Sequence, residues 1–451
     1  MGADADAVDR RAEWGRYMLT RSEMERLVPR ADAHYDVVVA GGGPAGLGAA
    51  VAASIAGVRT LLLEARSFFG GVGTTSPWMP MNRLLLDGGP RGGAHDLFVA
   101  KVQGYGDDGS VPGRANMIDG DGLNIQPEAI RMAAFEALEE AGCHYRLYSP
   151  VTGVVMQESA LRGVVVTTKS GTQVFTADVT VDATGDGDVA YHAGAEMVVG
   201  REEDGRSMPV SLVFALANTD PDRLLSYLDE ERAAYNALLD QAAADGYAVA
   251  AWYSFNRTTI PGVLGVNNGA MRDIGDLKGT QPQDMTVAER AGLQVAVDFV
   301  RLARERRIPG LEDCHLMRVG ETAGVRDTRR LVGEYVLTVE DARTAPDFPD
   351  VVARKYGAID ANQLFIGEMA SGFGYPYRSL LPKQIENLLV AGRCGSATFL
   401  GHAAGKSMGN MMEVGQAAGT AAALCSAGEV TPRELDVSLL QARLRGMGVR
   451  L

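Results

Sequence analysis

The stretch YDVVVAGGGPAGLGAA, residues 35–50, decides the fold of this chain. An apolar run typical of a buried strand leads into glycines with G-x-G-x-x-G spacing, and a helix of small residues is predicted behind them. Gly41 permits a tight turn, Gly43 lets a pyrophosphate approach the backbone, and Gly46 allows the helix to pack closely on the strand. The helix N-terminus adds unpaired N–H groups and a positive dipole end. The pattern therefore predicts a dinucleotide-binding βαβ unit.

An acidic residue at the end of the next predicted strand supports this interpretation. The run RTLLLE, residues 59–64, ends in Glu64, which follows Gly43 by 21 residues (64 − 43). This is close to the spacing at which an acid binds a ribose hydroxyl. The pair Gly70-Gly71 predicts a loop that passes under a large flat cofactor, which a nicotinamide dehydrogenase does not need. A glycine turn in some other α/β protein is the alternative, and the combined pattern argues against it.

The composition of the chain limits the classes of protein that fit. Its 451 residues, 46% hydrophobic and 22% charged, predict a soluble globular protein of two closely packed domains. The formal net charge of −14 argues against nucleic acid as a partner, because phosphate contacts require a basic face. No apolar run reaches the about 18 residues of a membrane span, and no secretory signal is recognised, so we expect a cytoplasmic protein. The four cysteines and six histidines lack ligand spacing, and no metal is expected.

The order of predicted elements indicates an α/β fold with an inserted domain. Residues 1–34 are predicted to form a helical extension. Residues 35–199 and 376–451 are predicted to form a Rossmann-like domain, with a parallel sheet and a small antiparallel meander over residues 145–177. Residues 200–375 are assigned to an α+β substrate or cap domain, with helices near 221–245 and 286–307. Residues 85–125 lack a clear period and are interpreted as an extended loop.

The C-terminal part returns to the pattern of the first domain. Residues 386–391, ENLLVA, predict a strand, which Gly392 and Arg393 follow. Residues 408–419 then lead into a predicted helix of very small residues at 420–424. Such a helix packs closely on other backbone, and its N-terminus stabilises negative charge. The first domain is therefore expected to be completed by both ends of the chain.

Six segments resemble FAD-dependent oxidoreductases of the glutathione-reductase-like fold, in particular the family that includes the flavin module of heterodisulfide reductase. They span about residues 35–425 and read GGGPAGLGAA, LLLEARSFFGG, VDATGDGDVA, GVRDTRRLVGEYVLT, PYRSLLPK and NLLVAGRCGSATFLGHAAGKSMGNMMEVGQAAGTAAAL. The resemblance implies one FAD per chain, and no signature of covalent attachment is apparent. It places along the cofactor Gly41, Gly43, Pro44, Ala45, Gly46, Glu64, Ala65, Arg66, Gly70, Gly71, Thr75, Val151, Ala183, Thr184, Gly185, Gly392, Arg393, Gly415, Gln416 and Ala417.

Three residues are candidates for catalysis beside such a cofactor. Hydride removal from a substrate requires a base that titrates near neutral pH, and His402 lies between the late strand and the small-residue helix. A hydrogen-bonded core histidine is the alternative. Tyr377 and Arg378 follow a Gly/Pro loop at the domain junction, where Arg378 either clamps a substrate carboxylate or forms an interdomain ion pair. The arginine-rich run at 321–330 is either an anion clamp or, as we favour, a solvated face.

Three functions compete. We expect two-electron oxidation or reduction of a small organic substrate by FAD. A homo-oligomer is compatible with the sequence. An electron-transfer subunit for a partner protein is the second function, but the iron–sulfur cysteines of the heterodisulfide enzymes are missing. A flavin monooxygenase is the third, although aromatic hydroxylases of this broad fold usually carry Gly-Asp where this chain has Gly392-Arg393. Family members often have Pro at the position of Gly409 and Arg at the position of Lys406, so the chain departs from the family at these two positions as well.

Overall fold

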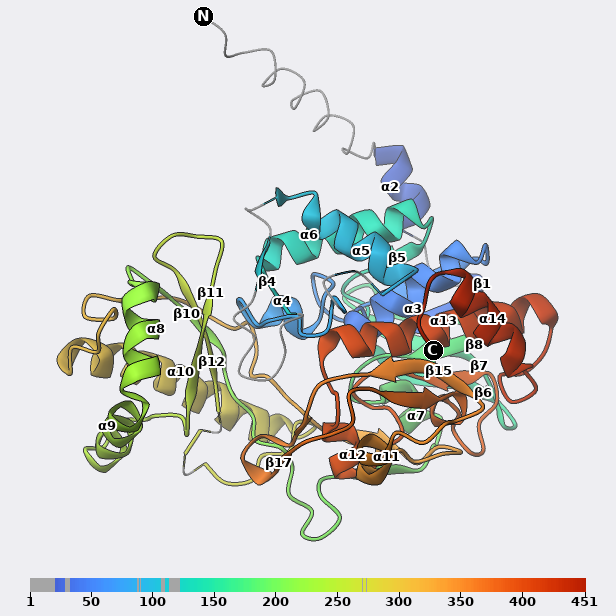
Figure 1. The fold of residues 1–451 in the computed structure, drawn as a ribbon. Helices are drawn as coiled ribbons and strands as arrows, with labels where there is room; N and C mark the ends of the chain where they lie inside the picture. Colours follow the sequence, from blue (N-terminus) through green and yellow to red (C-terminus); the bar gives the residue numbers. More distant parts are fainter. Residues whose placement is uncertain are drawn as a thin grey trace, which may run out of the picture.

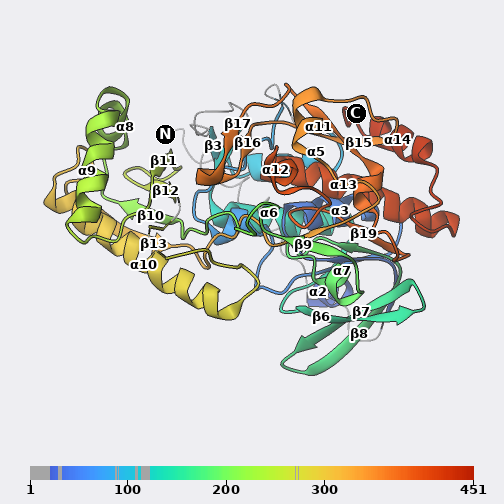
Figure 2. The ribbon, with the colours of Figure 1, turned by 90° about the horizontal axis from the view of Figure 1, so that it is seen from below.

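A seven-stranded sheet forms the centre of the first domain (Figures 1 and 2). The computed structural model describes residues 21–28, 33–86, 89, 91–106, 110–112, 122–269, 271, 272 and 274–451. The strand order is β5-β2-β1-β8-β7-β6, and β19 pairs with the last part of β8. The parallel strands are β1 (His34–Ala40), β2 (Thr60–Leu63), β5 (His144–Arg146), β8 (Gly171–Asp182) and β19 (Leu388–Val390). The predicted α/β fold with a parallel sheet is confirmed.

The same sheet continues into an antiparallel meander, which lies at the lower right in Figure 2. It consists of β6 (Val151–Gln157), β7 (Ala160–Thr168) and the first part of β8. Residue 177, where the predicted meander ends, lies inside β8, which is one strand of 12 residues. Its first half pairs with β7, and its last residues pair in parallel with both β1 and β19. One strand therefore carries the chain from the meander to the carboxyl edge of the parallel sheet.

Two helices of small residues pack almost backbone to backbone beside this sheet (Figure 1). They are α3 (Pro44–Ile55) and α13 (Met408–Gly428). A Cβ at Gly415 would lie 1.9 Å from the carbonyl oxygen of Ala45, and one at Gly419 would lie 2.0 Å from that of Ala49. The prediction that this helix begins at residue 420 is wrong, because tertiary contacts that only glycine permits outweigh the low helix propensity of glycine. The helix begins at Met408, directly after Ser407 in extended backbone.

Shorter elements surround the beginning of the first domain. α5 (Ala94–Gln103) and α6 (Pro127–Glu140) pack against each other and on α3, next to α4 (Val72–Thr75). The prediction of a loop throughout residues 85–125 is wrong at α5, where His95, Phe98, Val99 and Val102 are buried at helical spacing. β3 (Ser110–Pro112) pairs with β4 (Leu123–Ile125). The rest of the predicted loop, at 87, 88, 90, 107–109 and 113–121, lies outside the described residues.

A second sheet with its own apolar core forms the cap (left in Figure 1). Its antiparallel strands, in spatial order, are β11 (Tyr253–Arg257), β12 (Leu264–Asn268), β10 (Phe214–Ala217) and β13 (His315–Val319). The helices α8 (Pro221–Glu230), α9 (Arg232–Ala244) and α10 (Pro282–Glu305) cover one face, where the rings of Phe214, Tyr253 and Phe299 meet. The opposite face turns toward the first domain (Figures 1 and 2).

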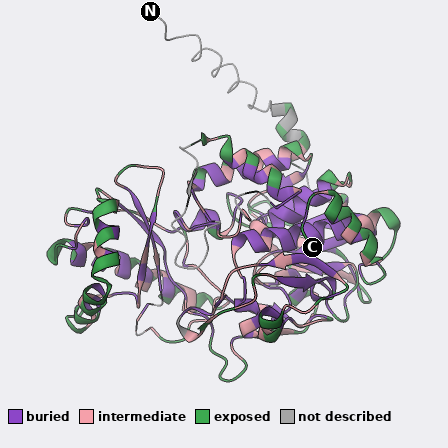
Figure 3. Cartoon of the chain, viewed as in Figure 1, coloured by how far each residue is buried: buried purple, intermediate pink, exposed green. Residues whose placement is uncertain are grey.

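The chain between the cap and β19 packs with the first domain. Leu337, Val352, Ile359 and Phe373 belong to the same apolar core as Val39, and Figure 3 shows buried residues along this segment. Its elements are α11 (Val339–Thr344), β15 (Val351–Lys355), β16 (Ile359–Asp360), η2 (Asn362–Leu364), β17 (Ile366–Gly367), β18 (Phe373–Pro376) and η3 (Tyr377–Leu380). The domain division at residues 200 and 375 stays a prediction, and this packing favours a cap that ends earlier.

The remaining elements connect these parts. The predicted extension at residues 1–34 lies mostly outside the described residues, which include α2 (Arg21–Leu27). The loop after β8 contains α7 (Asp188–His192) and leads to β9 (Met197–Val199), which pairs with β14 (Arg329–Leu331). α12 (Phe399–Ala403) precedes α13, and α14 (Val437–Gly446) ends the chain.

Candidate active site

The turn between β1 and α3 gives its three glycines different surroundings. Gly41 has a positive φ of 97°, and a Cβ there would lie 2.4 Å from the carbonyl oxygen of Ala183. A Cβ at Gly46 would lie 1.7 Å from the carbonyl oxygen of Gly41. A Cβ at Gly43, by contrast, would meet only the Cα of Gly71, at 3.9 Å. Gly41 and Gly46 therefore allow the tight packing, whereas Gly43 leaves its backbone open to a ligand.

The first turn of α3 offers backbone donors at this open position. Gly43 caps the helix without a side-chain acceptor, and Pro44 occupies the first helical position. Gly392, after β19, meets the same helix end, since a Cβ there would lie 3.0 Å from the Cβ of Ala45. Unpaired N–H groups at the positive end of the helix dipole fit a pyrophosphate.

The carboxylate of Glu64 joins the glycine turn to the loop that follows β2. Its Oε2 accepts a hydrogen bond from the N–H of Gly42 at 2.7 Å, and its Oε1 accepts one from the N–H of Arg66 at 2.7 Å. Burial raises the pKa of Glu64, although these hydrogen bonds favour the charged form. The N–H of Ser149, two residues before Val151, binds the carbonyl oxygen of Glu64. Each carboxylate oxygen can accept a second hydrogen bond, so Glu64 also fits a ribose.

The Gly70-Gly71 loop lies against the glycine turn. A Cβ at Gly71 would lie 2.9 Å from the Cα of Gly43, which has no side chain to obstruct this approach. Thr75 ends α4, and its carbonyl oxygen accepts the N–H of Glu321 at 2.8 Å, which joins this segment to the end of the cap. The predicted cofactor residues Ala65 and Arg66 are exposed on the loop, as is Ser67.

The loops after β8 and β19 lie side by side at the carboxyl edge of the sheet. The Oδ1 of the buried Asp182 accepts hydrogen bonds from the N–H of Thr184 at 3.0 Å and from its hydroxyl at 2.7 Å. Gly185 follows with a positive φ of 82°. Arg393 donates to the carboxylate of Asp186 at 2.8 Å, which ties one loop to the other. The structure thus brings together near the glycine turn the predicted residues Ala183, Thr184, Gly185, Gly392 and Arg393.

Three further predicted cofactor residues lie in the middle of α13. Gly415, Gln416 and Ala417 are buried, and the Oε1 of Gln416 accepts the N–H of Ala94. Gly415 packs on Ala45, and the Nε2 of Gln416 is buried without a partner among the described residues. Contact of the three residues with a cofactor stays a prediction. The positive end of α13 lies instead at Ser407, whose buried hydroxyl oxygen has no hydrogen-bond partner among the described residues.

His402 is buried where α12 meets the arginine-rich run. Its Nε2 lies 3.0 Å from the carbonyl oxygen of Arg326. Because a carbonyl oxygen only accepts, Nε2 carries the proton and Nδ1 keeps a lone pair. Burial lowers the pKa of His402 well below 6.5, and the charges of Arg330, Lys355 and Lys406 lower it further against the hydrogen bond to Arg326. His402 is therefore neutral near pH 7.

Sequence analysis missed a lysine beside His402. Lys355, the last residue of β15, is only 3% exposed, and within the described part of the chain its ammonium has no hydrogen bond or ion pair. Its Nζ lies 5.5 Å and 6.0 Å from the ring centres of Phe373 and Tyr375. Burial lowers the pKa of Lys355 to about 7, and the charge of Lys406 contributes. The one sequence signal was the position of this lysine, which follows Arg354 at the end of the apolar run VVA, residues 351–353.

The arginine-rich run packs between the two domains, so the interpretation as a solvated face is wrong. Arg330 is fully buried and donates to the carbonyl oxygens of Ala397 at 3.1 Å and Gly200 at 2.8 Å. Arg326 donates to the carbonyl oxygen of Pro209 at 2.7 Å. These hydrogen bonds fix backbone carbonyl groups of loops at the domain junction. Sequence patterns cannot distinguish such buried arginines from solvated ones.

The structure does not place Tyr377 and Arg378 beside His402. The hydroxyl of Tyr377 donates to the carbonyl oxygen of Pro432 at 2.7 Å, beyond the C-terminal end of α13. The 21 residues of α13 span about 30 Å, and His402 precedes the other end. Arg378 forms a bidentate pair with Asp350 at 2.9 Å and 3.2 Å. Catalytic roles for both residues stay predictions, and these contacts favour structural roles.

The cap sheet turns unpartnered polar side chains toward the first domain. Asn256 on β11 is 1% exposed, and among the described residues neither its Oδ1 nor its Nδ2 has a hydrogen-bond partner. Its neighbour across the sheet, Gly265, contacts Trp78 of the first domain. The Oδ1 atoms of Asn267 on β12 and of Asn124 on β4 are buried and unpartnered as well. Because buried polar groups nearly always have partners, these side chains fit a ligand.

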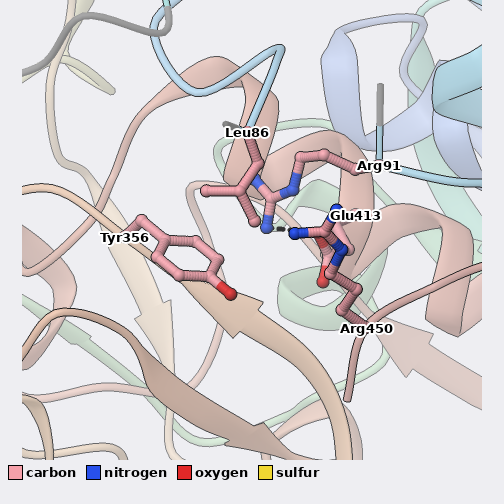
Figure 4. A pocket seen from close by; sticks show the side chains of 5 residues that line it. All are labelled: Leu86, Arg91, Tyr356, Glu413 and Arg450. Atoms are coloured by element: carbon pink, nitrogen blue, oxygen red, sulfur yellow. Dashed lines mark ion pairs between the residues drawn. The ribbon is translucent and has the colours of Figure 1, made fainter. Parts of the chain in front are cut away.

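The cavity drawn in Figure 4 serves internal packing. It has a volume of about 10 Å³, which at most admits one water. Arg91 and Glu413 form a buried ion pair on its wall. Burial raises the pKa of Glu413 to about 7, although the charge of Arg91 opposes the shift. The pair ties the segment before α5 to α13, and the cavity is lined by Leu86, Arg91, Tyr356, Glu413 and Arg450.

The described part of the chain offers neither a membrane span nor a metal centre. No helix in it has the length and hydropathy to cross a membrane. No group of three or more His, Cys, Asp or Glu side chains in the same residues is placed to hold a metal ion.

The parallel sheet, the open glycine turn and the cap together define an FAD-binding oxidoreductase. The chain belongs to the FAD dependent oxidoreductase family, which it matches over residues 36–444. FAD is therefore its cofactor, and the sequence prediction of this cofactor is confirmed. No curated protein sequence matches the chain.

One solved structure shares the fold, and two others are similar over most of the chain. The p-nitrophenol 4-monooxygenase PnpA from Pseudomonas putida DLL-E4 has a TM-score of 0.50 and 13% identity, with 93% of this chain and 91% of that chain covered. A geranylgeranyl bacteriochlorophyll reductase-like protein from Thermoplasma acidophilum has a TM-score of 0.47 and 14% identity, with 92% and 84% covered. The myxobacterial chondrochloren halogenase CndH has a TM-score of 0.45 and 15% identity, with 91% and 78% covered. At these identities the likeness concerns the fold alone.

Proposed function

We propose that this chain oxidises or reduces a small organic substrate by two electrons, and that the substrate lies between the cap sheet and the beginning of α13. The observation that carries the proposal is Asn256, which is buried on the face of the cap sheet toward the first domain with both polar atoms unpartnered among the described residues. An unsatisfied buried carboxamide costs about 1–3 kcal/mol for each group, and a ligand that pairs it removes this cost.

The glycine turn, the first turn of α3 and Glu64 are proposed to hold the pyrophosphate and the adenosine ribose of FAD. The open backbone at Gly43 and the free acceptor capacity of Glu64 support these roles. When bound, FAD supplies the hydride chemistry, whereas the protein supplies position and charge stabilisation. The relation to the flavin module of heterodisulfide reductase is part of this proposal and rests on the sequence segments that resemble it.

His402 is proposed to accept the proton that an oxidised substrate releases. Its Nε2 is held by the carbonyl oxygen of Arg326, which leaves Nδ1 as the acceptor. The lowered pKa keeps this acceptor unprotonated near pH 7. In a pH profile of the reaction, the ionisation of His402 should therefore appear below pH 6.5, because burial lowers the pKa of its imidazole.

Two other functions remain alternatives. The fold shared with the p-nitrophenol monooxygenase keeps a monooxygenase as one of them. An electron-transfer role for a partner protein is the other. Anaerobic flavin bleaching by a panel of amines, alcohols, hydroxy acids and NAD(P)H separates our proposal from a monooxygenase: direct bleaching by an organic substrate supports our proposal. Bleaching by NAD(P)H alone, followed by oxygen-dependent hydroxylation, supports a monooxygenase.

Exchange of His402 for Asn tests the proposed proton acceptor. The variant His402→Asn should retain FAD and slow flavin reduction by about 10²–10⁴-fold, the usual share of general-base catalysis. His192, which is exposed, offers the matched control His192→Asn. Loss of FAD together with activity would indicate a structural histidine, and reduction at the wild-type rate would exclude both roles.

A further inference from the structure

The side chains around His402 carry an excess of positive charge. Lys355 and Lys406 both lower its pKa, and the carbonyl oxygen of Arg326 accepts its Nε2 proton. The carboxylate of Asp360 lies 3.1 Å from the Nζ of Lys406, and that of Asp327 lies 3.5 Å from Arg330, whose charge also acts on His402. Four cations thus share two carboxylates.

The three cations Arg326, Lys406 and Lys355 differ in how their charges are accommodated. Arg326 donates to two backbone carbonyls, those of Pro209 and Asn268, at 2.7 Å and 3.3 Å. Lys406 donates to the carbonyl oxygen of Asp360 and pairs with its carboxylate. Among the described residues, Lys355 directs its ammonium only at two aromatic rings. A buried ammonium without a carboxylate is costly, so this position is built for an anion that arrives with a ligand.

Lys355 also lies against Gly405, two residues before the N-cap of α13. A Cβ at Gly405 would lie 3.1 Å from the Cβ of Lys355 and 3.2 Å from the Nδ2 of Asn410. The N-cap residue Ser407 provides no side-chain cap, and its buried hydroxyl is unpartnered within the described residues. The positive end of a 21-residue helix therefore adds to the charge of the lysine.

We propose that Lys355, with Ser407 and the N-terminus of α13, binds a carboxylate group of the substrate beside His402. The proposal rests on the proposed function, because it names the substrate class of the same site. A monoanion matches the single uncompensated ammonium, since Asp360 already pairs with Lys406. A carboxylate at this place would hold the substrate with its reacting carbon near the Nδ1 lone pair of His402.

Calorimetric titration of the full-length, FAD-loaded protein tests this assignment. Acetate is the probe, acetamide is its neutral isostere, and ionic strength is held constant. We expect acetate to bind and to perturb the flavin spectrum, and acetamide to do neither. Lys355→Met should weaken acetate binding at least 10-fold, and Lys355→Arg should retain most of it. The exposed Lys383, which pairs with Glu196, provides the control Lys383→Met, which should bind acetate like the wild type.

Several results would overturn the proposal. Equal binding of acetate and acetamide, or wild-type acetate affinity in Lys355→Met, excludes a carboxylate site at Lys355. Loss of FAD from Lys355→Met, with normal melting, would mean that the lysine serves the cofactor instead. If Lys355→Met unfolds, Lys355→Gln keeps a polar head group and is titrated in its place. A wild-type protein that carries no FAD would refute the proposed function, whereas the heat of acetate binding would still decide the anion site.

Discussion

Replacement of Lys355 by Met should stabilise the ligand-free fold, and the gain should depend on pH. Burial lowers the pKa of Lys355 from 10.5 to about 7. At 1.36 kcal/mol for each pKa unit, this lowering of about 3.5 corresponds to a penalty of about 5 kcal/mol, present in full below pH 7. Between pH 7 and 10.5 the unfolded chain binds a proton that the folded chain has released, so the wild type gains stability as pH rises. At pH 9 the remaining penalty is about 2 kcal/mol.

Urea unfolding at pH 6, 7, 8 and 9 measures this dependence in the wild type, Lys355→Met and Lys383→Met. The advantage of Lys355→Met should fall from about 5 to about 2 kcal/mol across this range, while the exposed control stays near zero. Lys406 and His402 interact electrostatically with Lys355; His402 remains neutral in this window because its own pKa lies well below 6.5. Saturating acetate should reduce the advantage. A constant difference between the proteins, or a less stable Lys355→Met at pH 6, would refute the account of an uncompensated ammonium.

Three further outcomes follow from the first domain. Glu64→Ala should destabilise the apo-protein by about 2–4 kcal/mol, because the buried N–H of Gly42 and the part-buried N–H of Arg66 lose a charged acceptor, and should weaken its FAD affinity; unchanged values in urea unfolding and FAD titration would reject both roles. Gly43→Ala should weaken FAD binding with little change in the melting temperature of the apo-protein, whereas Gly46→Ala should lower that melting temperature, because only the latter Cβ meets backbone at a forbidden distance. Acid precipitation should release the FAD into the supernatant; a yellow pellet would show covalent attachment.

Local requirements explain what could be predicted from the sequence. The spacing of Gly41, Gly43 and Gly46 expresses steric demands between a strand and the helix that follows it, within a few residues. The alternation of apolar residues in the meander and the periodic helices of the cap are likewise local. Such features predict the Rossmann-like sheet, the dinucleotide-binding turn and the inserted cap, because each needs only neighbouring residues to be read. The FAD prediction came instead from the resemblance of six segments to a family.

Only the tertiary structure decided where α13 begins and what surrounds His402. Residues 408–419 carry glycines that disfavour a helix locally, and they are helical because Gly415 and Gly419 meet the backbone of α3, more than 350 positions earlier (415 − 45 = 370). Lys355 ends a strand, a place where a lysine is usually solvated. Its burial comes from Phe373, Tyr375 and Gly405, which approach it through the folding of distant segments. Charge compensation at such a position depends on long-range contacts, which leave no period or spacing in the sequence.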